Sequence, residues 1–367
     1  MEAHRGTAVV YLLMCLWTVL GSVATKRFDP SAVGKGEKAW GYIPVTNSLA
    51  ANVDMPVMVL NGAQAGPTFT VTAGIYPTEF CGVEAAGRLY QEVDPKVLKG
   101  RLVIIPVANM PVLRFRTPMF QLTQSVSPMD GKMLAAVFPG SPNGTVTEVI
   151  ADAVFSFVRG SKYHVDLRGG DLPESHLTHT IFLQGAGLDN VSRAMGTVFG
   201  TRYCRESRPS MFDTKPGSLI FESLAHGVAS IISESGRGFD PQPTEEDVRT
   251  HVRGVENLLR WAGMLPGRPE PHSGQQYYLE PDIRSVVATA AGIFKHRPDR
   301  GDKVKEGEIV GEIADLDGTI LAQLRSPCDA VVHEMMPRRL VYPGDTVYHL
   351  VVISGPVGAQ ADALLPV

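Results

Sequence analysis

The sequence predicts an α/β domain followed by a smaller all-β domain. Segments typical of strands and helices alternate from about residue 40 to residue 265, whereas short apolar runs between turns fill the last part of the chain. Residues 266–274 contain Pro, Gly, Arg and Ser, which is typical of a linker. We therefore expect an α/β domain over residues 25–265, a linker over 266–274, a β domain over 275–355 and a tail over 356–367.

The composition is that of a folded protein with a sizeable core. The chain has 367 residues, of which 44% are hydrophobic and 20% charged. Its net charge is −4 and it has no long basic run, so nucleic-acid binding is not expected. The four Cys residues form no CxxC pair and no metal-ligand spacing, and they indicate no disulfide framework.

The N-terminus has features of a targeting segment. An apolar stretch from Thr7 to Leu20 is followed by small residues at Ser22 and Ala24, which is typical of a secretory cleavage site. The stretch is short for a membrane span, which needs ~20 residues. We expect residues 1–24 to be a signal peptide and the protein to be exported to a periplasm or the extracellular space. An uncleaved anchor and a misassigned start codon are the alternatives.

In the first half, the pattern indicates strands that lead into turns and helices. Phe69 to Ala73 is an apolar strand that ends in a tight turn carrying Glu79, and a helix is expected from Gly82. Arg101 to Val107 is a continuous apolar run, which predicts a strand buried on both faces. Thr145 and Glu148 have the spacing of a capping box at the start of the next helix.

Two later strands also end in polar residues. Tyr163 to Leu167 is followed by Arg168, and Val228 to Ser233 is followed by Glu234. Thr244 begins a long amphipathic helix with acidic residues in its first turn. In open α/β sheets the carboxyl ends of the strands carry the functional residues, so these polar residues are candidates for one site.

The C-terminal part resembles the barrel-sandwich fold of biotinyl and lipoyl carrier domains. Two similar turns, Arg300 to Val304 and Pro343 to Val347, flank the run Ser326 to Val332. Carrier domains place an acceptor Lys in the hairpin between their halves. Here that hairpin is Asp315 to Gly318 and contains no Lys, so no carried cofactor is expected.

The order of motifs over roughly residues 45–355 resembles the succinylglutamate desuccinylase/aspartoacylase family of zinc-dependent amidohydrolases, which are related to carboxypeptidases. The resemblance implies a zinc-carboxypeptidase-like mixed sheet flanked by helices, followed by the barrel-sandwich domain. The motifs that carry it are Gly74 to Glu79, Pro106 to Asn109, Asp130 to Gly140, Asp166 to Gly170 and Glu234 to Gly236.

The chain departs from the family at the positions that bind zinc and substrate. The family has His-x-x-Glu after the first strand, and here Tyr76 stands at the His position while Glu79 is kept. Arg168 stands where the family has its third zinc ligand, a His. Ala135 and Ala136 replace the Asn-Arg pair that grips the substrate carboxylate, whereas Glu234 matches the general acid/base.

These substitutions predict a catalytically degenerate homologue without a cofactor. Catalytic zinc usually has three protein ligands, and an Arg guanidinium cannot be one because it stays protonated. We expect Arg168 to pair with Glu79 in place of the metal and Tyr76 to fill the remaining volume. Such a homologue would bind a small anionic metabolite at Arg168 and Arg116, or would support a protein partner.

Two other functions remain open. A zinc site rebuilt from Glu79, His164 and Tyr76 would make the protein an active metallo-amidohydrolase with Glu234 as general acid/base. The simpler interpretation of His164 is a hydrogen-bonded core histidine, and His176 and His179 follow it in a loop. Alternatively, the protein is an exported scaffold that works through its β domain, as a homo-oligomer or with a protein partner.

Substrate contacts have one further set of candidates. Arg114 and Arg116 lie in the irregular section where the family uses an Arg to bind its substrate. The alternative is that both are solvated surface residues, which is the usual state of Arg.

Overall fold

The computed structural model describes residues 27–47, 52–115, 126–170, 174–209, 213–237, 243–336 and 340–356. The predicted signal peptide, Arg116 and nearly all of the predicted tail lie outside these residues. Within the described ranges, no helix is long and apolar enough to cross a membrane.

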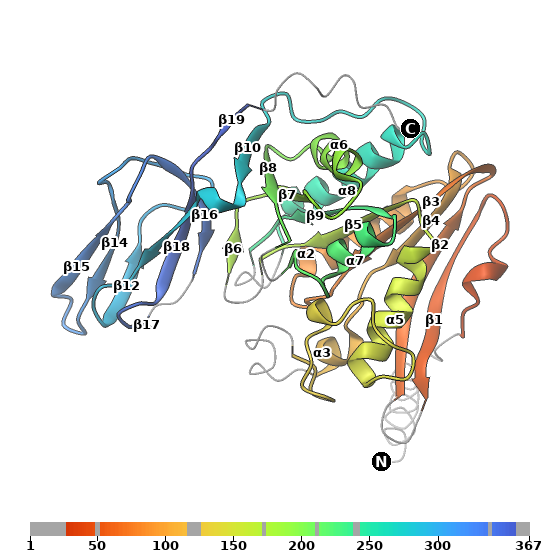
Figure 1. The fold of residues 1–367 in the computed structure, drawn as a ribbon, viewed down its shortest axis with the longest axis horizontal. Coiled ribbons are helices and arrows are strands. Elements are labelled where there is room, and N and C mark those ends of the chain that lie inside the picture. Colours follow the sequence, from red (N-terminus) through yellow and green to blue (C-terminus); the bar gives the residue numbers. More distant parts are fainter. Residues whose placement is uncertain are drawn as a thin grey trace, which may run out of the picture.

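A large mixed sheet forms the centre of the molecule (Figure 1). Strands β4, β3, β5 and β9 are parallel neighbours, whereas β2 and β7 pair antiparallel with β4 and β9. The spatial order is β1 (Glu37–Asn47), β2 (Asn52–Asn61), β4 (Lys99–Ile105), β3 (Gln64–Ala73), β5 (Tyr163–Arg168), β9 (Ala229–Glu234), β7 (His179–Leu183), β8 (Tyr203–Ser207), β10 (Gln276–Leu279) and β19 (Gly355–Pro356).

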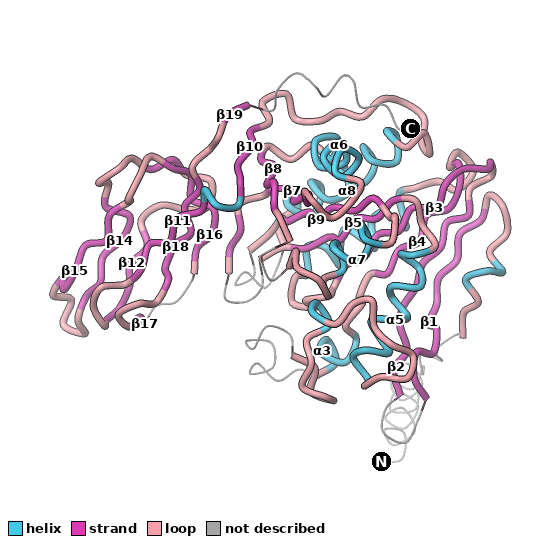
Figure 2. The backbone as a smooth tube through the Cα atoms, in the orientation of Figure 1, coloured by secondary structure: helices cyan, strands magenta, loops and turns pink. Residues whose placement is uncertain are grey.

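Helices cover both faces of this sheet, with α6 and α8 on one side and α3 and α5 on the other (Figure 2). Strand β4 shows why both faces are covered. Its Leu102 and Ile104 pack into one hydrophobic cluster and Val103 and Ile105 into the other, so the predicted double-sided burial is confirmed. The helices are α2 (Phe80–Glu92), α3 (Met110–Arg114), α5 (Val146–Arg159), α6 (Asp189–Phe199), α7 (Leu219–Ala225) and α8 (Glu245–Trp261), with short 3₁₀ turns at Pro30–Ala32, Leu134–Ala136 and Glu280–Asp282.

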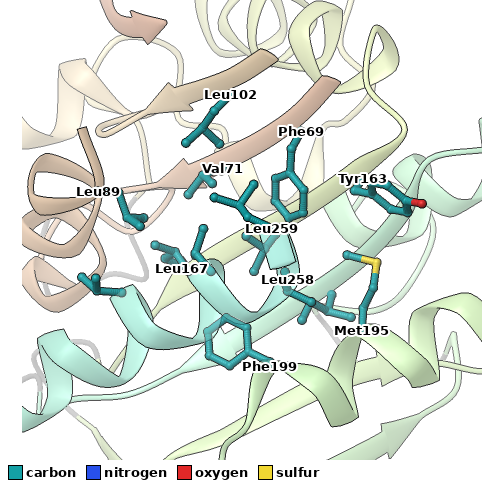
Figure 3. Close-up of a cluster of buried hydrophobic side chains, with 14 of the residues drawn as sticks. Phe69, Val71, Leu89, Leu102, Tyr163, Leu167, Met195, Phe199, Leu258 and Leu259 are labelled. Carbon is teal, nitrogen blue, oxygen red and sulfur yellow. The ribbon is translucent and has the colours of Figure 1, made fainter. Parts of the chain in front are cut away.

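The larger cluster joins the sheet to α2, α6 and α8. Figure 3 shows Phe69 and Leu102 of the sheet facing Leu258 and Leu259 of α8. Helix ends follow the predicted caps. Thr145 and Glu148 form a capping box at α5, and the Thr244 hydroxyl accepts the backbone N–H of Asp247 at α8.

The C-terminal strands form two smaller sheets beside the β8–β10 end of the large sheet (Figure 1). The predicted strand-rich character of this part agrees with the structure, and its assignment as a barrel-sandwich domain stays a prediction. One sheet contains β11 (Ile283–Val287), β18 (Thr346–Val351), β16 (Ala330–Met335) and β13 (Lys303–Val304), and the other β15 (Ile320–Arg325), β14 (Ile309–Ala314), β12 (Gly292–His296) and β17 (Leu340–Val341).

Two strand pairings help to connect the C-terminal strands to the rest of the chain. The short strand β6 (Ser175–His176) leaves the α/β part and pairs antiparallel with β16, so that His176 lies opposite Glu334. Strand β10, which follows the predicted linker, pairs with β8, so the large sheet continues past residue 274.

A buried ion pair strengthens this junction. Both Asp247 oxygens accept hydrogen bonds from Arg300 Nη2, at 3.0 and 3.0 Å. The Nη1 atom of Arg300 donates to the carbonyl oxygens of His176 and Gly236, at 2.9 and 2.8 Å. Because Arg300 has little freedom in this arrangement, it fixes the backbone of His176 against helix α8.

Candidate functional site

A cavity of about 800 Å³ opens between the carboxyl ends of the central strands and the C-terminal sheet. Strands β5 and β9 end side by side there, with Arg168 paired in register to Glu234. The cavity therefore brings together Tyr76, Glu79, Arg168 and Glu234, four of the candidate site residues predicted from the sequence. The cavity is lined by Tyr76, Glu79, Arg168, Glu174, His176, His179, Ile181, Arg205, Glu206, Arg208, Asp213, Glu234, Leu279, Glu280, Pro281, Ile283, Ser285, His333, Glu334 and His349.

Arg168 is a buried cation held by carboxylates. Its side chain is 2% exposed, its Nε donates to Asp166 Oδ2 at 2.6 Å, and its Nη1 donates to Asp213 Oδ1 at 2.8 Å. Burial lowers the pKa of Arg168, but the charges of Asp213 and Asp166 more than offset this, and the pKa stands well above its ordinary value. The guanidinium is therefore permanently charged and fixed in orientation.

Tyr76 completes this arrangement. Its hydroxyl donates to Asp213 Oδ1 at 3.1 Å, and its ring lies 5.0 Å from Cζ of Arg168. Burial and the charge of Asp213 raise the pKa of Tyr76 well above its usual value, so the side chain is a neutral phenol. A neutral phenol that stacks on a guanidinium is a poor metal ligand.

Glu79 lies buried at the start of α2 and lines the same cavity. Its negative charge contributes to the raised pKa of Arg168. The structure gives Arg168 ion pairs with Asp166 and Asp213. The direct hydrogen bond between Arg168 and Glu79 stays a prediction.

The residues that the resemblance places at the zinc position do not fit a zinc ion. A fixed guanidinium lies there, and the neighbouring oxygen donors Asp166 and Asp213 already accept hydrogen bonds from it. A dication would have to approach this buried monocation, which Coulomb repulsion opposes.

His164 lies inside the sheet rather than on the cavity wall. One ring nitrogen lies 2.9 Å from Thr72 Oγ1 and the other 2.7 Å from Ser230 Oγ. Burial lowers the pKa of His164 to about 4. With both nitrogens held by hydroxyls, it has the contacts of the hydrogen-bonded core histidine that was the simpler interpretation of the sequence.

Glu234 faces the cavity from the end of β9. It is 7% exposed, and among the described residues its Oε2 has no hydrogen-bond partner. Burial raises the pKa of Glu234 to about 7, although His176 and Arg168 act in the opposite direction. A carboxyl with this pKa can both take and return a proton near neutral pH.

A second group of polar side chains lies where β6 meets β16. Ligand atoms of His176, His333 and Glu334 all lie within 4.8 Å of one another. Burial lowers the pKa of His176, but Glu334 and Glu174 raise it more, to about 10. Burial raises the pKa of Glu334 to about 7 and lowers that of His333 well below its ordinary value.

The remaining predicted substrate residues lie away from this cavity. Ala135 is buried in the hydrophobic cluster around α5, and Ala136 follows it in the same 3₁₀ turn. Arg114 is exposed at the end of α3, and Arg116 lies outside the described residues. None of the three described residues lines the cavity.

Sequence reasoning missed several residues of the site. Asp213 and Arg205 carried no motif, and only the fold brings them to the cavity. His333 and Glu334 did leave a signal, because they are two consecutive polar residues inside an otherwise apolar strand whose residues are all buried. A buried strand rarely carries such a pair without a specific role.

Comparison with known proteins gives both a sequence relative and a common fold. No protein-family model matches the sequence. The chain is 27% identical over 338 residues to the N-alpha-acetyl-L-2,4-diaminobutyric acid deacetylase of Halomonas elongata, covering 88% of this chain and 93% of that protein.

Solved structures share the fold. A succinylglutamate desuccinylase from Silicibacter sp. superposes with a TM-score of 0.74 at 22% identity, covering 87% of this chain and 95% of that one. The succinylglutamate desuccinylase/aspartoacylase of Rhodobacter sphaeroides gives 0.72 at 24% identity, with 89% and 98% covered. The product-bound ectoine utilization protein EutE of Ruegeria pomeroyi gives 0.72 at 22%, with 88% and 97% covered. The predicted resemblance is confirmed: the chain is similar in sequence to the deacetylase and shares the fold of succinylglutamate desuccinylase/aspartoacylase proteins.

Proposed function

We propose that this protein binds a small N-acylated amino acid in the cavity and does not hydrolyse it through a zinc ion at the Tyr76, Glu79 and Arg168 positions. The observation that carries the proposal is the Arg168 guanidinium, buried and hydrogen-bonded to Asp166 and Asp213. The relatives are named as deacylases of amino acids, which sets the class of ligand.

The cavity supports a ligand of this class by size and charge. Its volume of about 800 Å³ is within the range of small-molecule sites. Carboxylates outnumber arginines along its wall, so an ammonium group is better accommodated than a plain dianion. Arg205 is buried with its Nε bonded to Ser207, and it can hold a ligand carboxylate. These features favour a zwitterionic ligand over the purely anionic one expected from the sequence.

Hydrolysis is a second candidate function, and Glu234 favours it. A carboxyl with a pKa of about 7 at the end of β9 can take a proton from a water molecule and return it to a leaving amine. A metal ion held nearby would supply a bound water of lowered pKa and would polarise the acyl carbonyl. Arg205 would orient the ligand, and the wall of the cavity would exclude bulk water.

Calorimetry with two probes tests the binding proposal. We expect Nα-acetyl-L-2,4-diaminobutyrate, which carries an ammonium group, to bind more tightly than N-succinyl-L-glutamate, which carries only carboxylates. Arg205→Met should weaken binding by about 10- to 100-fold because a charge-assisted hydrogen bond is lost, whereas Arg205→Lys should retain part of it. Arg114→Met is the matched control and should bind normally. Equal or tighter binding of the succinyl compound would contradict the proposal.

An amine-release assay separates the two candidates. Binding without release of free amine supports the first. Release that is lost in Glu234→Gln, while calorimetric binding persists, supports hydrolysis.

A further inference from the structure

We propose that His176, His333 and Glu334 form a binding site for one divalent transition-metal ion, with Zn²⁺ as its first candidate, at the junction of the large sheet and the C-terminal sheet. Their ligand atoms lie within 4.8 Å of one another. These residues are not the ones at the Tyr76, Glu79 and Arg168 positions. The proposed metal site is therefore independent of whether the cavity binds an N-acylated amino acid.

The backbone of β16 is shaped so that two consecutive residues can act together. Successive side chains of a regular strand point to opposite faces of the sheet. The pairing of β16 with β18 shifts between Val332 and Glu334, which leaves His333 as an extra residue at that point. A β-bulge of this kind re-aims a side chain, and His333 and Glu334 both line the cavity.

Both histidines are oriented in the way that metal-ligating histidines usually are. His176 Nε2 lies 2.9 Å from Glu174 Oε2, and His333 Nε2 lies 2.9 Å from the hydroxyl of Tyr278. In each ring the other nitrogen, Nδ1, is buried and has no hydrogen-bond partner among the described residues. A carboxylate or other polar group on one ring nitrogen, with the other nitrogen turned inward, is the usual outer-shell arrangement of a metal site.

His179 adds a third buried nitrogen without a partner, and the tautomer of this ring is defined by its contact. Its Nδ1 lies 2.6 Å from the carbonyl oxygen of Leu177. A carbonyl can only accept, so Nδ1 carries the proton and Nε2 carries the lone pair. That Nε2 is buried without a partner in the described structure, and the ring lies 5.0 Å from the ring of His333. Three orphaned nitrogens in one place are costly unless something binds them.

The donor set identifies the class of metal. Two imidazole nitrogens and one carboxylate suit Zn²⁺ and its first-row neighbours, whereas Mg²⁺ and Ca²⁺ prefer oxygen donors. Three protein ligands leave one position open toward the cavity. The rival explanation is a metal-free cluster in which a His176 imidazolium is shared among the carboxylates of Glu174, Glu234 and Glu334.

The test is a metal titration of the full chain without a histidine tag, after removal of metal with a chelator. Zn²⁺ affinity is measured against a chromophoric chelator, and bound Co²⁺ is followed by its visible absorption. We expect one ion per chain. Glu334→Gln and His333→Gln should each lower the affinity by at least about 100-fold, because even outer-shell changes cost 10- to 100-fold. His272→Gln removes an exposed histidine that lies outside the cavity, and it should keep the wild-type affinity.

Three results would overturn the proposal. The first is the absence of stoichiometric Zn²⁺ or Co²⁺ binding to the wild-type chain. The second is loss of the metal in Glu79→Gln with retention in His333→Gln, which would place the ion at the Tyr76 and Arg168 end. The third is equal loss in His272→Gln. Thermal unfolding in chelator verifies that each variant is folded. If His333→Gln does not fold, Glu334→Gln takes its place in the comparison. Calorimetry of the amino-acid ligand in chelator separates a failure here from a failure of the proposed function.

Discussion

The two ends of the cavity differ in where their positive charge comes from. At one end, Arg168 is a covalently attached cation that donates to Asp166 and Asp213. At the other end, His176, His333 and Glu334 are candidate metal ligands. The Nδ1 atoms of the two histidine rings have no hydrogen-bond partner in the described part of the chain. A buried charge is tolerated only when it is paired. The comparison teaches that this fold can place a positive charge beside buried carboxylates in two ways. One is an attached side chain such as Arg168, and the other is a group of ligands suited to a metal ion.

The largest expected effect comes from removing the attached cation. Arg168→Met should lower the free energy of unfolding by about 3–5 kcal/mol, because the buried Asp166 and the half-buried Asp213 would lose their counter-charge. Urea unfolding measures the change. Arg114→Met, at an exposed position, is the control and should remain within about 0.5 kcal/mol of wild type. A loss as small as the control's would mean that Arg168 does not hold this end of the cavity together.

The next effect depends on pH and concerns Glu234, which lies between the two ends. Its folded pKa of about 7 exceeds the ordinary 4.5, so the folded state holds a proton that the unfolded state has already lost. The Glu234 side chain therefore destabilises the protein progressively as pH rises from about 4.5 to about 7. Relative to wild type, Glu234→Gln should gain on the order of 3 kcal/mol over this window, since one pKa unit corresponds to about 1.4 kcal/mol.

Urea unfolding of both proteins at several pH values provides the measurement. Subtracting the two curves cancels the contributions of groups that do not interact with Glu234, whereas His176, which does interact with it, contributes to the difference. A stability difference that stays constant from pH 4.5 to pH 7 would show that Glu234 is not held in this environment.

Loading the opposite end with metal should stabilise the protein. If Zn²⁺ binds the folded state alone, a free concentration 100 times the dissociation constant adds about 2.7 kcal/mol to the free energy of unfolding. The gain should disappear in His333→Gln and persist in Arg168→Met. Persistence in the second variant is the sharper result, because it shows that the two ends are independent.

The smallest effect tests the support of the metal-binding end. Arg300→Gln leaves the three donors in place but removes the hydrogen bond to the carbonyl of His176. We expect Zn²⁺ affinity to fall about 10-fold, the lower end of the range for outer-shell changes. A competition titration with the chromophoric chelator measures this, and unchanged affinity would show that β6 is held by β16 alone.

Much of the fold and one end of the site were predictable from the sequence. The double-sided burial of β4 and the caps at Thr145 and Thr244 are local features, and local sequence encodes them. Tyr76, Arg168 and Glu234 follow strand ends, so the topology of a parallel sheet brings them together.

The other end was not predictable for a physical reason. His176 and Glu334 meet through a two-residue strand that joins a different sheet, and no local periodicity marks so short an element. Asp213 and Arg205 likewise reach the cavity only through long-range packing. Isolated charged residues such as these have no local sequence pattern that tells a surface position from a buried ion pair.

The pairing of β6 with β16 has a consequence for how the protein is made. The two strands are separated by more than a third of the chain, so the cavity wall that they share forms only after the C-terminal strands have left the ribosome. Until then, His176 and the ends of β5 and β9 in the α/β part stay open to solvent. Any metal or amino acid that binds there would therefore bind only to the finished polypeptide. A chain truncated before Ala330 would lack both the β16 wall of the cavity and the β-bulge at His333.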